Sequence, residues 1–152
     1  MHRLSAVRFT IAIVLGSAAV AGCGSSKQSA AAWKAKVDPI CAQLIADRNA
    51  GTAGFTTEQP SADQLTAFYV SFAPKLATAS KAIKALKRPS GLDSQVTELF
   101  AALDGVVAYV QNSSTDPAAV QAEISGVGSK HDEVFGRLQA ATTAAGIPEC
   151  NG

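Results

Sequence analysis

The sequence has 152 residues, which is enough for one domain with one hydrophobic core rather than two. Hydrophobic residues make up 47% of the chain and charged residues 16%, a composition typical of a helix-rich globular protein, and it excludes collagen-like, disordered and polytopic membrane proteins. The 13 basic and 12 acidic side chains nearly cancel, which argues against a nucleic-acid partner.

The beginning of the chain has the pattern of a secretory signal peptide. Arg3 and Arg8 make the first residues basic, and a mostly apolar run extends from Phe9 to Val20. An apolar run of about 12 residues would span about 18 Å as a helix, against about 30 Å for the hydrocarbon core of a bilayer. The length therefore favours a cleaved leader over a permanent transmembrane helix.

An aliphatic residue, two small residues and a cysteine follow this run as Val20-Ala21-Gly22-Cys23. The four residues resemble the lipobox of bacterial lipoproteins. The resemblance implies cleavage before Cys23 and attachment of diacylglycerol to its thiol, with an unmodified secreted protein as the alternative. We expect a signal peptide at residues 1–22, a lipidated N-terminus with a flexible tether at 23–29, and a folded domain at 30–152.

In the expected domain, apolar residues recur at intervals of three and four, the period of helices that bury one face. Three segments fit this period without a break, and a shorter one precedes them: Trp33–Leu44, Leu65–Leu86, Leu92–Val110 and Val120–Ala141. Four helices with short connections between the last three predict antiparallel neighbours in an up-down-up-down four-helix bundle.

Local signals predict where the helices begin and end. Ser61 and Gln64 have the spacing of a capping box, and Asp116 precedes a proline at the expected start of the fourth helix. The Pro-Ser-Gly segment at 89–91 should stop the second helix, and Gly146 should end the fourth.

Two prolines fall within the helical pattern. Pro39 either starts the first helix or kinks it, and Pro74 should bend the second helix because it removes one backbone hydrogen bond.

Three cysteines in an exported protein leave one thiol unpaired, but lipidation of Cys23 leaves an even pair, Cys41 and Cys150. The bundle topology also returns the tail at 146–150 to the end of the bundle where the first helix begins. We therefore predict a disulfide between Cys41 and Cys150, with two buried free thiols as the alternative.

His131 is the only histidine after the expected leader, and it occupies an inward position in the fourth helical pattern. A ligand or pH-switch role is conceivable, but no Glu-x-x-His spacing of a bundle metal site accompanies it. A partly exposed histidine at the flank, or one satisfied by a facing hydroxyl or carboxylate, is the favoured interpretation. The glycine-containing segment 126–130 lacks Walker spacing and is expected to be a small-residue helix face. We predict no metal and no cofactor.

Four basic residues gather near the end of the second helix: Lys81, Lys84, Lys87 and Arg88. On a solvated face they would complement the helix dipole, which is the default interpretation. The alternative is contact with anionic headgroups, because the bundle topology places this end beside the lipidated N-terminus.

The lipobox, the early Trp33, the cysteine placement and the closing Gly-Ile-Pro-Glu-Cys at 146–150 together resemble the small lipoproteins of high-GC Gram-positive bacteria. The resemblance covers the whole chain and implies attachment to the outer face of the cell membrane. It implies no particular activity.

We expect a noncatalytic binding or interaction module of the cell envelope, whose partner is an unknown envelope protein or a small ligand. Such a module should have an exposed apolar patch or an inter-helix cavity, near Trp33, Phe55, Phe68 or Phe100. One alternative is an enzyme with polar groups converging near His131 in a cleft. The other is a structural spacer that has neither feature.

Overall fold

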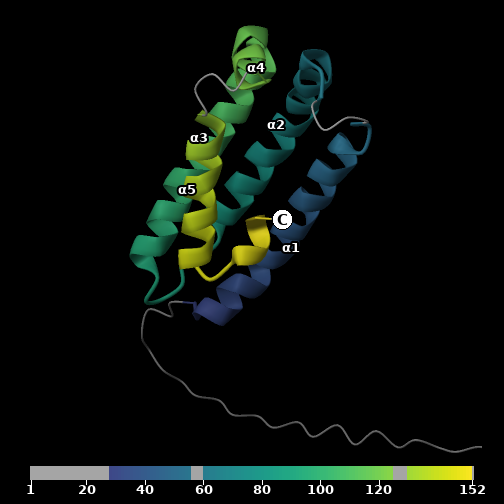
Figure 1. Ribbon diagram of the computed structural model, residues 1–152. Coiled ribbons are helices and arrows are strands. Elements are labelled where there is room, and N and C mark those ends of the chain that lie inside the picture. The colour runs from purple at the N-terminus through teal and green to yellow at the C-terminus, as the bar shows by residue number, and fades with distance from the viewer. Residues whose placement is uncertain (1–27, 56–59, 125–129, 152) are drawn as a thin grey trace, which may run out of the picture.

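The computed structural model describes residues 28–55, 60–124 and 130–151. Their elements are α1 (Ala30–Thr52), α2 (Ala62–Ala85), α3 (Asp93–Thr115), α4 (Pro117–Ile124), α5 (Lys130–Ala144) and the 3₁₀ helix η1 (Pro148–Asn151). Four main helices pack side by side like a bundle, α1 on α2, α2 on α3, and α3 on α5 (Figure 1). The predicted all-α fold is therefore confirmed.

The predicted helix boundaries rest on hydrogen bonds that the structure shows. The backbone N–H of Gln64 donates to Ser61 Oγ at 3.2 Å, and the Ser61 N–H donates to Gln64 Oε1 at 2.9 Å. The Ala118 N–H donates to Asp116 Oδ1 at 2.9 Å. Gly146 follows α5 with a φ of 75°, a left-handed conformation in which glycine is the favoured residue. These caps and this stop agree with the sequence prediction.

α1 begins well before its proline. The Ala32 N–H donates to Ser29 Oγ at 3.2 Å, which makes Ser29 the N-cap. Pro39 therefore lies inside α1 and does not start it. Pro74 likewise lies inside α2.

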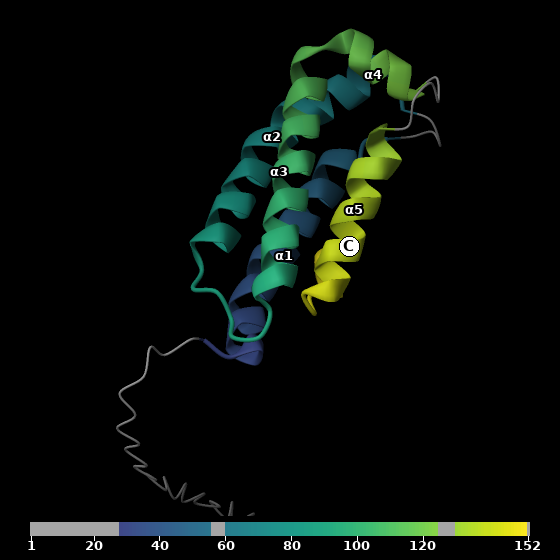
Figure 2. The ribbon, with the colours of Figure 1, turned by 90° about the vertical axis from the view of Figure 1, so that its left-hand side faces the viewer.

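The single fourth helix predicted over Val120–Ala141 is wrong. Its residues form two helices, α4 and α5, and the residues between them, 125–129, lie outside the described ranges. α4 packs against α2 and α3 near one end of the bundle, whereas α5 runs beside α3 (Figure 2). The intervening sequence carries two glycines, and each costs about 1 kcal/mol inside a helix.

The buried residues form two clusters along the bundle. The first cluster lies at the end where α1 begins and consists of Trp33, Val37, Cys41, Ile83, Val96, Leu99, Ala102, Leu103, Ala141, Ala145 and Ile147. The second cluster lies toward the other end and consists of Tyr69, Phe72, Ala73, Leu76, Val106, Val110 and Val120. α1 supplies buried residues to the first cluster alone, and only its half-buried Leu44 packs against the second.

The start of α1 is tied to the connection between α2 and α3. Gln28 forms a β-bridge with Pro89, and the Ser90 N–H donates to the Gln28 carbonyl oxygen at 2.9 Å. The last two residues of the predicted tether, Gln28 and Ser29, thus belong to the fold. We call this end of the bundle, where α1 begins and residues 86–92 connect α2 to α3, the N-terminal pole.

Candidate functional site

An apolar groove of about 410 Å³ runs between α1 and α5, and we call it the α1–α5 groove. Its deepest residues belong to the second core cluster: Phe72 and Leu76 from α2 and Val106 from α3. Leu76 is 3% exposed and Val106 is 1% exposed, so the groove reaches the core of the bundle. A concave site with this lining has the character of a small-molecule pocket.

The sides of the groove come from α1 and α5. Leu44 and Ile45 on α1 face it, as do Phe135 and Leu138 on α5, and all four side chains are half-buried. Gly136 also lines the groove, and a Cβ placed on it meets no atom of the described residues within 4 Å. A larger side chain at this glycine would therefore extend into open space.

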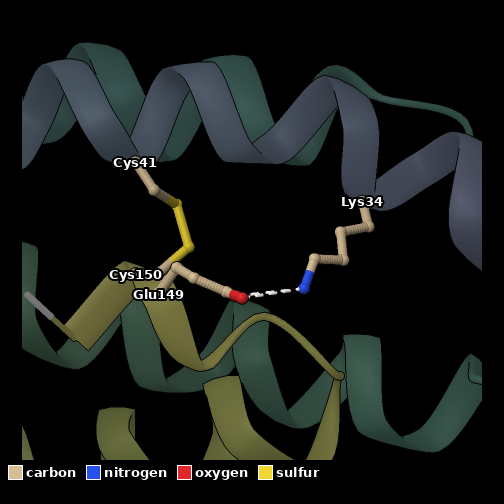
Figure 3. Close-up of polar contacts among 4 residues, drawn as sticks. All are labelled: Lys34, Cys41, Glu149 and Cys150. Atoms are coloured by element: carbon tan, nitrogen blue, oxygen red, sulfur yellow. Dashed lines mark hydrogen bonds and ion pairs between the residues drawn. A yellow bond between two sulfur atoms is a disulfide. The ribbon is translucent and has the colours of Figure 1, made fainter.

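The 3₁₀ helix η1 borders the groove, where it lies between α1 and α5. η1 packs against both helices. Cys41 in α1 is bonded to Cys150 in η1 with the two Cα atoms 4.9 Å apart, which confirms the predicted disulfide (Figure 3). Cys150 also lines the groove. The 3₁₀ helix thus lies between α1 and α5 beside Cys41, and the groove extends from Cys150 toward Leu44 and Arg48, farther along α1.

A second contact fastens η1 to α1. Lys34 Nζ donates to both carboxylate oxygens of Glu149, at 3.0 and 3.1 Å (Figure 3). The pKa of Glu149 is lowered, first by a hydrogen bond from its own backbone and then by Lys34. Because the pair is exposed to solvent, its contribution to stability is small, and the disulfide is the stronger of the two links.

The opening of the groove carries one cation and one anion. Arg48 on α1 is half-buried, and its Nη2 donates to the side-chain oxygen of Asn49 at 3.2 Å. Asp132 on α5 accepts from the His131 ring at 3.0 Å, and its side chain is 79% exposed. Among the described residues Arg48 makes no ion pair. Its guanidinium charge is thus not neutralised by a described carboxylate.

A wider cleft of about 870 Å³ lies between α3, α4 and the start of α5, and we call it the His131 cleft. The His131 side chain is 44% exposed, so the predicted inward position is wrong, and the flank position favoured for it agrees with the structure. Its ring lies 4.5 Å from that of Phe135 and 6.0 Å from that of Tyr109, centre to centre. α5 starts as a separate helix at Lys130, so the stripe of α4 does not continue through His131.

Other polar residues line the His131 cleft, among them Asn112, Asp116 and Lys130. The hydrogen bond between the His131 ring and Asp132 joins neighbours in sequence, which differs from the linked nucleophile, base and orienting group of a triad. Within the described ranges, no three His, Cys, Asp or Glu residues are grouped so that they could hold a metal ion.

The four basic residues near the end of α2 have different environments. Lys84 forms an ion pair with Asp104 on α3. Arg88 Nη1 donates to Thr97 Oγ1 at 2.9 Å, and its guanidinium carbon lies 5.1 Å from the centre of the Phe100 ring. Lys81 and Lys87 are exposed. Arg88 and Lys84 thus also help to attach the end of α2 to α3.

The aromatic residues expected beside a cavity lie elsewhere. Trp33 is 0% exposed in the first core cluster, and Phe100 lies beneath Arg88. Phe55 and Phe68 contact each other edge to face at 6.1 Å. The aromatic residues of the groove are instead Phe72 and Phe135. Phe72 is part of the apolar stripe of α2, but Phe135 is one residue outside the predicted stripe, so the period gave no signal for it.

Several sequence predictions fall outside the described residues: the leader at 1–22, the lipobox with Cys23, and the small residues at 126–129. In the ranges that are described, no helix is both long and apolar enough to cross a membrane. No protein-family model, curated protein or solved structure matches the chain.

Proposed function

We propose that the chain is a lipoprotein anchored at the outer face of the cell membrane, and that its helical domain is a noncatalytic binding module for a small ligand. The observation that carries the binding role is the α1–α5 groove, because it is a concave site in the middle of the bundle whose lining is mostly buried and half-buried apolar side chains. The anchor rests on the leader-like run and on Val20-Ala21-Gly22-Cys23.

The fold is compatible with such an anchor if the four main helices form an up-down-up-down bundle. Cys23 precedes Gln28 by only five residues, so the lipid would be attached within about 17 Å of the N-terminal pole. The groove lies beyond Cys41, farther along α1, and would open to the side of the domain above the membrane surface.

The lipid anchor predicts a mass and a location. Protein isolated from its native envelope should begin at Cys23 and carry a diacylglycerol mass on that residue, and Cys23→Ser should leave the chain unlipidated. Intact-mass spectrometry of the two proteins measures both. An intact leader, or a bare Cys23 thiol on the native protein, would refute the anchor and leave the binding role untouched.

The basic cluster should assist the anchor at anionic membranes. In the unlipidated Cys23→Ser chain, replacing Lys81 and Lys87 by glutamine should weaken binding to phosphatidylglycerol vesicles about 30-fold at low salt, since each basic residue contributes about 1 kcal/mol there. Vesicle co-sedimentation across salt concentrations measures this.

The matched control for the vesicle experiment replaces Lys75 and Lys130 by glutamine. Lys75 lies in the middle of α2 and Lys130 at the start of α5, away from the N-terminal pole. Their replacement removes the same net charge as the replacement of Lys81 and Lys87. Equal weakening by both pairs would mean that net charge alone, without a defined membrane-facing end, accounts for binding. Binding that is indifferent to salt would also argue against the headgroup contact.

Filling the groove should abolish ligand binding without harming the fold. A leucine at Gly136 would extend into the groove, and it should add about 1 kcal/mol of helix stability relative to glycine. We expect Gly136→Leu to reduce labelling of the groove by a photoreactive long-chain alcohol at least about tenfold, which is 1.4 kcal/mol of affinity. Peptide mapping by mass spectrometry, on the intact chain in vesicles, measures the labelling.

Gly105→Leu is the control for this experiment. Gly105 lies in α3 and lines the His131 cleft, and a Cβ there also meets no atom of the described residues within 4 Å. In the Gly105→Leu variant, the photoreactive alcohol should label the groove peptides as strongly as it does in the unmodified chain. If the groove peptides are not labelled in either protein, the binding role is wrong and the domain is better described as a structural spacer.

The competing function is that of an enzyme, and the His131 cleft is the observation in its favour. There His131 and Asp132 are hydrogen-bonded beside Tyr109 in an open cleft. Such an enzyme should lose turnover on His131→Ala while keeping the groove labelling unchanged. The noncatalytic proposal instead expects no turnover of any substrate by the unmodified protein, and it expects His131→Ala to leave labelling of the groove peptides unchanged.

A further inference from the structure

We infer that the ligand of the α1–α5 groove is a single-chain fatty acid whose carboxylate pairs with Arg48. The inference rests on the proposed binding function and adds the chemical class of the ligand. It follows from the shape of the groove, its lining, and the charge at its opening.

The size and lining of the groove fit one alkyl chain. A cavity of about 150 Å³ lined by apolar residues holds one benzene molecule, so at the same density the groove has room for about 16 carbon atoms. Phe72, Leu76 and Val106 along its depth offer no side-chain hydrogen-bond donor or acceptor. A polar body would lose its hydration there without compensation, whereas an alkyl chain gains from leaving water.

The charge at the opening selects the head group. A guanidinium has five N–H donors, and the one acceptor that the structure gives Arg48 is the neutral side-chain oxygen of Asn49, at 3.4 Å from Nε and 3.2 Å from Nη2. A carboxylate matches the planar fork of a guanidinium and would supply the missing negative charge.

The anion on the opposite side does not cancel this preference. Asp132 extends from α5, its carboxylate oxygen lies 3.0 Å from His131 Nδ1, and its side chain is 79% exposed. It is therefore both solvated and directed to a neighbour. A bound carboxylate would be repelled from the α5 side and attracted to the α1 side, where Arg48 lies. A cationic head group would be attracted by Asp132 on the α5 side, but it would be repelled by the half-buried guanidinium of Arg48 on the α1 side.

The test compares two photoreactive probes of equal chain length, a fatty acid and the corresponding alcohol, on the intact chain in vesicles. We expect the acid to label the groove peptides at least about tenfold more than the alcohol, as a charge-assisted hydrogen bond should provide. Arg48→Gln should lower acid labelling until the ratio of acid to alcohol labelling is about one, and Arg48→Lys should restore part of that ratio. Arg137→Gln, which removes an arginine paired with Glu98 outside the groove, is the matched control and should change neither probe.

The outcomes separate this inference from the binding function. Equal labelling by acid and alcohol, with no effect of Arg48→Gln, would overturn the fatty-acid assignment while the groove remained a binding site. Acid labelling that survives Gly136→Leu would also overturn it, because the acid would then bind elsewhere. Absence of groove labelling by both probes would remove the binding function together with the inference.

Discussion

Replacing Cys41 and Cys150 together by alanine should lower the free energy of unfolding by about 4 to 5 kcal/mol, the chain-entropy value for a loop of this length. The bond joins residues 109 positions apart, so without it the unfolded chain gains much conformational freedom. Alanine is preferable to serine because Cys41 is 3% exposed and a hydroxyl there would be buried in an apolar cluster. Urea unfolding followed by circular dichroism measures the change.

Chemical reduction of the unmodified chain should reproduce the effect of the double substitution, since it breaks the same bond. Val70→Ala is the control for a change of side chain that leaves the core intact, because Val70 is 56% exposed, and it should stay within about 0.5 kcal/mol. A loss below about 1 kcal/mol in the cysteine variant would contradict the chain-entropy account for this domain.

The disulfide also connects stability to the groove. Cys150 lines the groove, and η1 packs against both α1 and α5, so the bond holds the element that separates these helices. Without it, η1 is retained on α1 by the exposed pair of Lys34 and Glu149, a weak link, and by the burial of Ile147 in the first core cluster. The folded fraction of the double alanine variant should therefore bind the groove probes more weakly than the unmodified protein does.

The parts of the fold that the sequence predicted depend on local chemistry. The capping box of Ser61 and Gln64, the N-cap of Asp116 and the glycine stop at Gly146 each act within a few residues, and each is seen in the structure. The disulfide was predictable from the parity of the cysteines and from the return of the tail toward α1.

The groove was not predictable in the same way. The apolar period indicates which face of a helix is apolar, but not whether a neighbour covers that face. Leu44 continues the stripe of Trp33 and Val37, yet it is only half-buried and lines the α1–α5 groove. The same limitation applies to His131, which the continuous apolar period placed on an inward face but which lies in the first turn of α5, a helix separate from α4.

The second large effect should come from the core of the N-terminal pole. Trp33→Ala should cost about 3 to 5 kcal/mol of unfolding free energy, because this side chain is 0% exposed and packs in the first core cluster, where its removal leaves a cavity. It is the only tryptophan of the chain, so unfolding should be followed by circular dichroism rather than by fluorescence.

Trp33→Phe separates packing from polarity at this position. The Trp33 Nε1 atom is buried and has no hydrogen-bond partner among the described residues, and burying such a group costs about 1 to 3 kcal/mol. Phenylalanine leaves a smaller cavity than alanine does and also removes the unpaired N–H, so its cost should be less than half that of alanine. If phenylalanine were as costly as alanine, the indole N–H would have to be satisfied in solution by an ordered water. The first core cluster would then contain a polar contact on which the attachment of α1 depends.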